Sequence, residues 1–71
     1  MKFSQQLLHD IHSIRDKRQL SYRDLAKESF VSRDVLWKLL EKKVQKISLH
    51  NLDRLWIYRK KWENYIETNY Q

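Results

Sequence analysis

Hydrogen-bonding side chains recur at helical spacing between residues 32 and 41. If this segment is a helix, its outer face carries Arg33, Asp34, Trp37 and Lys38. Arginine and lysine donate to guanine or phosphate, aspartate can accept from the amino group of cytosine, and an apolar ring can contact a thymine methyl group. We therefore expect these four residues to contact bases. Two alternatives stay open: Asp34 also suits the positive end of a helix, and Trp37 could be partly buried in the core.

Further polar and basic residues flank this segment on both sides. Lysines follow it, and a serine, a tyrosine and an arginine stand at the start of the helix expected before it. Such groups bind the phosphate backbone, which fixes the register of a protein on DNA but carries no sequence information. The expected backbone contacts are Ser21, Tyr22, Arg23, Ser32, Lys42, Lys43 and Lys46. For the three lysines, the alternative is an ordinary solvated loop.

The elements that must position these residues are four predicted helices, over residues 4–18, 22–29, 32–41 and 48–70. Apolar residues recur at intervals of three and four in each segment. Ser21, Ser32 and Ser48 stand where N-caps are expected, and Asp24 completes a capping-box pattern with Ser21. Asp10 is expected on the outer face of the first helix. The predicted core consists of Phe3, Leu7, Ile11, Ile14, Leu25, Ala26, Val31, Val35, Leu36, Leu39, Leu40, Leu49, Leu52, Leu55 and Trp56.

Composition favours one small all-α domain that spans residues 1–71. The chain contains no Gly and no Pro, which disfavours tight hairpins and phosphate-binding glycine loops. It carries 15 Lys and Arg against nine Asp and Glu, a formal charge of +6 that suits a polyanionic partner such as nucleic acid. No cysteine, signal peptide or membrane-spanning apolar run is evident, so we expect a soluble, cytoplasmic protein.

Catalysis and metal binding are not expected. His9 and His12 share a helical face, but Asp10 points elsewhere and His50 is distant in the sequence. The sequence offers no serine–histidine–aspartate arrangement and no paired carboxylates in an evident pocket. We therefore expect no enzyme activity, no metal ion and no cofactor.

A family resemblance rests on four residue pairs and on the helix that follows them. The pairs are Ile14 with Arg15, Leu20 with Ser21, Leu25 with Ala26, and Val31 with Ser32, and the later helix has Ser48, Leu49, Leu52 and Leu55. In order and spacing, residues 14–57 resemble the helix-turn-helix region of the phage Cro and repressor family. The resemblance implies a compact four-helix domain, with a helix-turn-helix unit over residues 22–41 and a recognition helix over 32–41. It also implies a repressor or Cro-like transcriptional regulator that binds a palindromic operator as a homodimer, in a bacterial or phage-infected cell.

Several positions depart from that family. Gln19, Phe30 and Lys42 stand where the family often has glycine, and Ser29 stands where an apolar residue is usual. The turn after the second helix often requires a positive φ, so we expect Phe30 to take over the missing apolar packing and to reshape the turn. The family's Arg–Glu pair is not expected, because Glu41 lies one residue beyond the matching position and would point about 100° away from it.

The end of the chain carries more large apolar side chains than a small four-helix core needs. Trp62, Tyr65, Ile66 and Tyr70 form one stripe if the last helix continues to residue 70. This stripe could fold back on the first helix, or it could form a homodimer interface, which the binding of two operator half-sites favours. The alternative function is a helix-turn-helix protein-interaction module (an antirepressor, an inhibitor or an assembly factor), which Asp34, Trp37 and this aromatic stripe support. The aromatic helix could then dock another protein.

Overall fold

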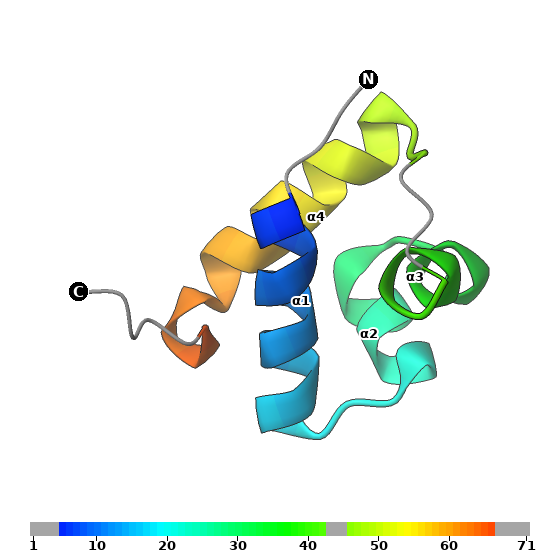
Figure 1. The fold of residues 1–71 in the computed structure, drawn as a ribbon. Coiled ribbons are helices and arrows are strands. Elements are labelled where there is room, and N and C mark those ends of the chain that lie inside the picture. Colours follow the sequence, from blue (N-terminus) through cyan, green and yellow to red (C-terminus); the bar gives the residue numbers. More distant parts are fainter. Residues whose placement is uncertain (1–4, 43–45, 67–71) are drawn as a thin grey trace.

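The computed structural model describes residues 5–42 and 46–66, which form four α-helices and one 3-10 turn. The elements are α1 (Gln5–Arg18), α2 (Tyr22–Ser29), α3 (Arg33–Leu40), α4 (Leu49–Lys61) and η1 (Glu63–Tyr65) (Figure 1). The described part contains no strand, so the predicted all-α class is confirmed. Among the described helices, none has the length and apolar character needed to cross a membrane.

Serine hydroxyls begin three of the four helices, as predicted. Ser21, Ser32 and Ser48 each accept a hydrogen bond from the backbone N–H three residues later, at 3.0 to 3.2 Å. Each bond satisfies an amide that has no partner within the first helical turn, and such a cap typically stabilises a helix by about 1 kcal/mol. Local sequence therefore fixes where α2, α3 and α4 begin.

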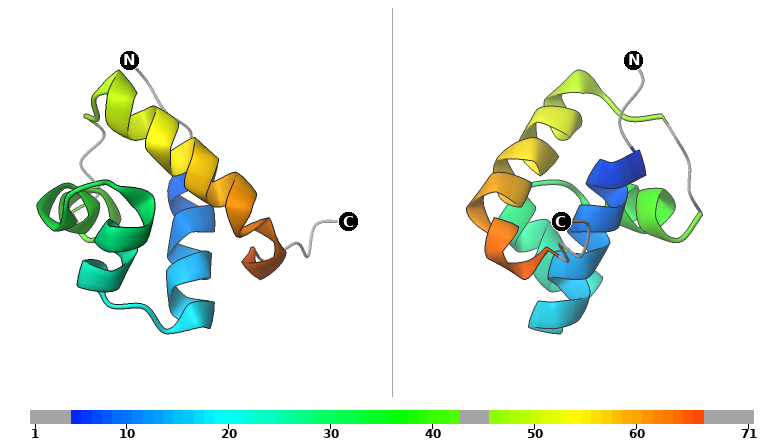
Figure 2. Two further views of the ribbon diagram at one scale, coloured as in Figure 1. Left: turned by 180° about the vertical axis from the view of Figure 1, so that it is seen from behind. Right: turned by 60° about the vertical axis from the view of Figure 1, so that its left-hand side comes forward.

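The helices pack around one apolar core. Helix α4 crosses α1, the α2–α3 pair lies on one side of α1, and η1 lies on its other side (Figures 1 and 2). The deepest apolar side chains come from all four helices and from the turn before α3: Leu7, Ile11, Ile14, Leu25, Val31, Leu36, Leu39 and Leu55. Most of the predicted core is thus confirmed, and Phe3 lies outside the described residues.

Helix α4 is rotated relative to the expectation. Leu49 and Trp56 were expected in the core, but both are exposed, whereas Leu52, Leu55 and Tyr58 are buried. The buried residues are spaced three apart, so they form a continuous stripe along one face of the helix, as the expected residues also would. Which stripe of α4 faces inward is therefore decided by its contacts with α1 and α2.

The expected helix over residues 48–70 is interrupted, because α4 ends at Lys61. Trp62 leaves the helical backbone at φ −114° and ψ 27°, and η1 follows. The chain turns back against α1, where Ile66 is only 6% exposed and the Trp62 ring centroid lies 3.5 Å from Cζ of Arg18. These contacts stabilise the break, which no glycine or proline marks in the sequence. Tyr70 lies outside the described residues.

An ion pair between a buried carboxylate and a partly buried arginine ties α1 to α4. Asp10 was expected on the outer face of α1, but it is 0% exposed, and that expectation was wrong. Its carboxylate accepts hydrogen bonds from Arg59 Nε at 2.6 Å and from Gln6 Nε2 at 2.9 Å. The partner that makes burial of this charge tolerable is on another helix, so the pattern of α1 alone could not show it.

A second polar network joins α1, α2 and α4. Arg18 holds both carboxylate oxygens of Glu28, at 2.5 and 3.0 Å, and the Tyr58 hydroxyl donates to Glu28 at 2.7 Å. The hydrogen bonds from Arg18 lower the pKa of Glu28, whereas burial and the bond to Glu28 raise the pKa of Tyr58. At neutral pH, the carboxylate is therefore ionised and the phenol protonated, which are the states that these bonds require.

The turn between α2 and α3 keeps a left-handed residue although glycine is absent. Phe30 has φ 62° and ψ 26°, and its side chain is 74% exposed. The expectation that Phe30 packs into the core and reshapes the turn is therefore wrong. Ser29 is buried instead, and its hydroxyl donates to the Leu25 carbonyl at 2.8 Å and accepts from the Val31 N–H at 3.3 Å. Both bonds make a buried serine tolerable where an apolar residue was expected.

Replacing Phe30 by glycine is expected to stabilise the domain. A residue with a Cβ in the left-handed region costs about 1–2 kcal/mol, and the greater freedom of glycine in the unfolded chain offsets about 0.5–1 kcal/mol of this. The exposed ring contributes little packing, so Phe30→Gly should raise the free energy of unfolding by roughly 0.5–1 kcal/mol in urea denaturation. Phe30→Ala keeps the Cβ and should bring no such gain. An equal gain from both substitutions would contradict the backbone explanation.

Candidate nucleic-acid interface

Helices α2 and α3 form the frame of the candidate interface. Each has eight residues, and they are joined by Phe30, Val31 and Ser32. Their inner faces are anchored in the core by Leu25, Leu36 and Leu39. Arg54 of α4 donates from Nη1 to the Phe30 carbonyl at 2.6 Å, which ties the turn to α4. The outer face of α3 is therefore held in a fixed position.

The outer face of α3 carries all four expected base-contact residues, and all four are exposed. The side chain of Arg33 makes no hydrogen bond or ion pair with any other described residue. Asp34 lies in the first turn of α3 and pairs through Oδ2 with Lys38 Nζ at 3.1 Å. Trp37 is 42% exposed, which argues against the alternative that it belongs to the core.

A shallow hollow of about 310 Å³ opens on this face and is lined by Tyr22, Arg33, Asp34 and Trp37. Tyr22 is held from two sides: Cζ of Arg15 lies 4.2 Å from its ring centroid, and its hydroxyl donates to Glu41. Burial, followed by the bond to Glu41, raises the pKa of Tyr22 to about 12, so its hydroxyl stays protonated at neutral pH. Tyr22 thus connects Arg15 with Glu41, and sequence analysis missed this link because it involves three segments.

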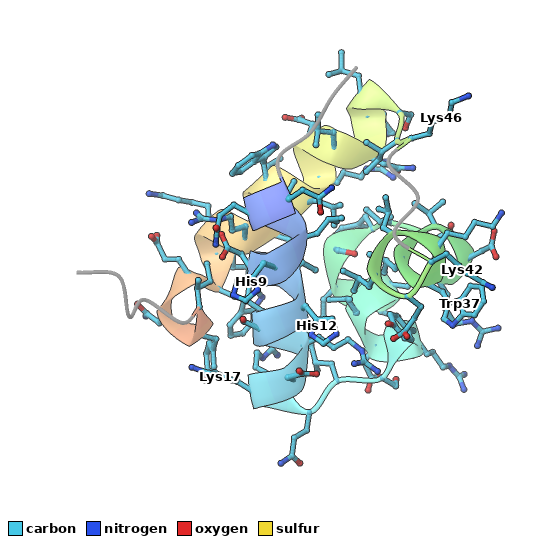
Figure 3. The ribbon with its side chains drawn as sticks, in the orientation of Figure 1. His9, His12, Lys17, Trp37, Lys42 and Lys46 are labelled. Carbon is cyan, nitrogen blue, oxygen red and sulfur yellow. The ribbon has the colours of Figure 1, made fainter. Side chains whose placement is uncertain are left out.

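Basic residues flank α3. Arg23 stands in the first turn of α2 and Lys46 precedes α4; both are exposed, and neither pairs with a carboxylate in the described part of the chain. Lys42 Nζ lies 5.3 Å from the ring centroid of Trp37, a cation–π contact. Figure 3 shows Trp37 on α3 and Lys42 just beyond the end of α3, both pointing outward on the side away from α1. These cations are available to an anionic partner.

The remaining expected backbone contacts are two serines and one lysine. Ser21 and Ser32 use their hydroxyl oxygens as N-cap acceptors, and each hydroxyl keeps a proton that can be donated to a phosphate. Lys43 lies outside the described residues. The structure therefore brings six of the seven expected backbone contacts to the ends of α2 and α3 or to the segment before α4.

One of the two histidines of α1 takes part in a local contact. Figure 3 shows His9 and His12 along α1, and His12 Nδ1 lies 3.1 Å from Asp16 Oδ2. Within residues 5–42 and 46–66, no three His, Cys, Asp or Glu side chains are grouped so that they could hold a metal ion. Among the described residues, no candidate metal site therefore competes with the α3 face as the functional site.

Comparison with known proteins identifies no relative. No protein-family model matches the chain, and neither a curated protein nor a solved structure matches it. The resemblance to the Cro and repressor family therefore stands on the sequence pattern alone.

Proposed function

We propose that this protein binds double-stranded DNA sequence-specifically and regulates transcription, as a phage-type repressor or Cro-like protein does. In this proposal, α2 and α3 act as a helix-turn-helix, with α3 in the major groove and α2 bracing it. The observation that carries the proposal is the outer face of α3. It bears four exposed polar or aromatic side chains and is flanked by cations that lack carboxylate partners among the described residues.

The exposed groups of α3 match the edges that base pairs present in the major groove. Arg33, the first residue of α3, can donate two hydrogen bonds to guanine. Asp34 holds Lys38 through Oδ2, which leaves Oδ1 to accept from the amino group of cytosine. Trp37 supplies an apolar wall of the hollow for a thymine methyl group. Phosphates would be contacted by Ser21, Tyr22, Arg23, Ser32, Lys42, Lys43 and Lys46.

Replacing Arg33 by alanine is expected to weaken binding to the preferred duplex by about 1–3 kcal/mol and to relax the preference at one base pair. The preferred duplex is found by selection from a random pool, and affinities are measured by fluorescence anisotropy at fixed salt. Lys60→Ala is the matched control, because it removes one exposed cation near the end of α4 and should change binding little. An equal loss on all sequences would make Arg33 a phosphate contact, and no duplex binding at low salt would refute the proposed function.

The three lysines between α3 and α4 are expected to add affinity without specificity. Replacing Lys42, Lys43 and Lys46 together by alanine should weaken binding to operator and random DNA by similar factors. Each lost phosphate contact should reduce the slope of log K against log salt by about one unit. The slope is measured by titration at several salt concentrations. An unchanged slope in the triple variant would show that this segment faces away from DNA.

A second candidate function is a protein-interaction module, and the charge balance of α3 together with its C-cap residue favours it. Over residues 33–41, two basic side chains are matched by two acidic ones, Asp34 and Glu41. An exposed Trp37 beside a hollow also suits a protein partner. The salt-dependent duplex binding described above separates the two functions, because an interaction module would bind no DNA.

The proposal includes a homodimer on a palindromic operator, since two recognition helices about 34 Å apart can contact successive major grooves. The expected interface is altered, however. Ile66 is buried within the monomer and Trp62 is partly covered, which leaves Tyr65 as the exposed member among the described residues. Up to Ile66, where the described residues end, the tail therefore carries much less exposed apolar surface than the sequence suggested.

A further inference from the structure

Phe30 and Ile57 form an exposed apolar pair beside a hollow at the end of α2. Their side chains are 74% and 63% exposed, and both line a hollow of about 180 Å³ between α2 and α4. The other lining residues are Glu28, Ser29, Arg54, Tyr58 and Lys61. None of these seven is among the expected DNA contacts, so this hollow is separate from the α3 face.

The backbone at Phe30 gives the first reason to expect a function here. A residue with a Cβ in the left-handed region costs free energy, and glycine would remove that cost. The side chain does not compensate for it, because most of the ring is in water. The left-handed backbone itself serves as the C-cap of α2, where the Phe30 N–H donates to the Ala26 carbonyl. It does not call for an aromatic side chain, so a ring kept in solvent at this position is a candidate anchor for a partner.

The charges around the hollow give the second reason. The carboxylate of Glu28 is already held by Arg18 and Tyr58, so its charge is compensated within the fold. Arg54 uses one nitrogen on the Phe30 carbonyl, and neither Arg54 nor Lys61 lies within ion-pair distance of a carboxylate in the described part of the chain. Asp53, the acidic residue one turn before Ile57, lines a different hollow. The rim is therefore positive.

From these two observations, we propose that the Phe30–Ile57 hollow binds a segment of another protein in which an apolar side chain is flanked by Asp or Glu. The apolar side chain enters the hollow between Phe30 and Ile57, and the flanking carboxylates pair with Arg54 and Lys61. A second copy docking by the same face would place these cations opposite one another, which disfavours self-association. The inference goes beyond DNA binding and does not depend on it.

The test is selection of short peptides from a random display library against the whole protein, followed by calorimetric titration of the enriched peptides. We expect peptides with a large apolar residue next to Asp or Glu, and binding that weakens with salt. Phe30→Gly and Ile57→Ser should each weaken it about tenfold or more, as loss of an anchoring side chain does. Lys61→Glu should weaken it as well. Because Phe30→Gly is expected to be more stable than the original chain, unfolding would not explain its loss of binding.

Leu49→Ser is the matched control, because Leu49 is an equally exposed apolar residue at the other end of α4 and lines a different hollow. It should leave peptide binding unchanged. The proposal is overturned if no peptide is enriched, if the enriched peptides are basic, or if Phe30→Gly and Ile57→Ser bind them as well as the original chain. It is also overturned if sedimentation shows a dimer that Ile57→Ser dissociates. Duplex binding measured on the same variants reports separately on the proposed function.

Discussion

Replacing Arg59 by methionine is expected to lower the free energy of unfolding by about 3–5 kcal/mol, because it leaves a buried carboxylate without its charged partner. Asp10 is fully buried, and after the substitution only Gln6 among its two hydrogen-bond donors remains. A small domain has only about 5–15 kcal/mol of net stability, so this variant should be close to unfolding at physiological temperature. Urea denaturation followed by circular dichroism measures the change.

Two further variants separate the buried charge from lost packing. Lys60→Met removes the neighbouring cation, whose contact with Glu63 at 3.5 Å is exposed, and it should change stability by less than about 1 kcal/mol. Replacing Asp10 by leucine together with Arg59→Met removes both charges and should restore most of the lost stability. If the double variant is no more stable than Arg59→Met, the loss came from the packing of the Arg59 side chain.

Ending the chain after Lys61 is the second change with a large expected effect on stability. It removes Trp62 and Ile66, which pack against α1, and deletion of one such side chain from a core costs about 2–5 kcal/mol. Arg18 would also lose the ring that covers its guanidinium. We therefore expect a truncated chain that is largely unfolded at room temperature. Ile66→Ala removes only one of these side chains, so it should lower the melting temperature in thermal denaturation but leave the chain folded at room temperature.

Concentration dependence distinguishes this packing from a dimer interface. If the tail packs within its own chain, the unfolding midpoint of the free protein should not depend on protein concentration. Tyr65→Ala is the control, because Tyr65 is exposed and its ring makes an edge-type contact with the Trp62 ring, so about 1 kcal/mol or less is expected. The opposite result would be a full-length protein that sediments as a dimer and a truncated chain that stays folded and sediments as a monomer. That result would make the stripe of Trp62, Tyr65, Ile66 and Tyr70 the dimer interface.

Much of the fold follows from short stretches of sequence. The capping serines placed the starts of α2, α3 and α4, since a cap bond joins residues only three apart. The apolar spacing of α1 and α3 placed Leu7, Ile11, Leu36 and Leu39 in the core. The exposed face of α3 followed in the same way, because on a short helix the residues that are not buried must point outward. The candidate interface was therefore predictable in its α3 part.

What the sequence determined by itself is the local part: three helix starts, the inward stripes of α1 to α3, and the charged outer face of α3. Tertiary structure decided the burial of Asp10, the rotation of α4, the end of α4 at Lys61 and the exposure of Phe30. For three of these four features, one distant partner can be named: Arg59 for Asp10, Arg18 for Trp62, and Arg54 for the carbonyl of Phe30. The rotation of α4 depends on its contacts with α1 and α2 as a whole. The physical reason is that a buried charge, a helix end without a breaker and a strained turn are stabilised by contacts between helices. Such contacts exist only after the helices have packed.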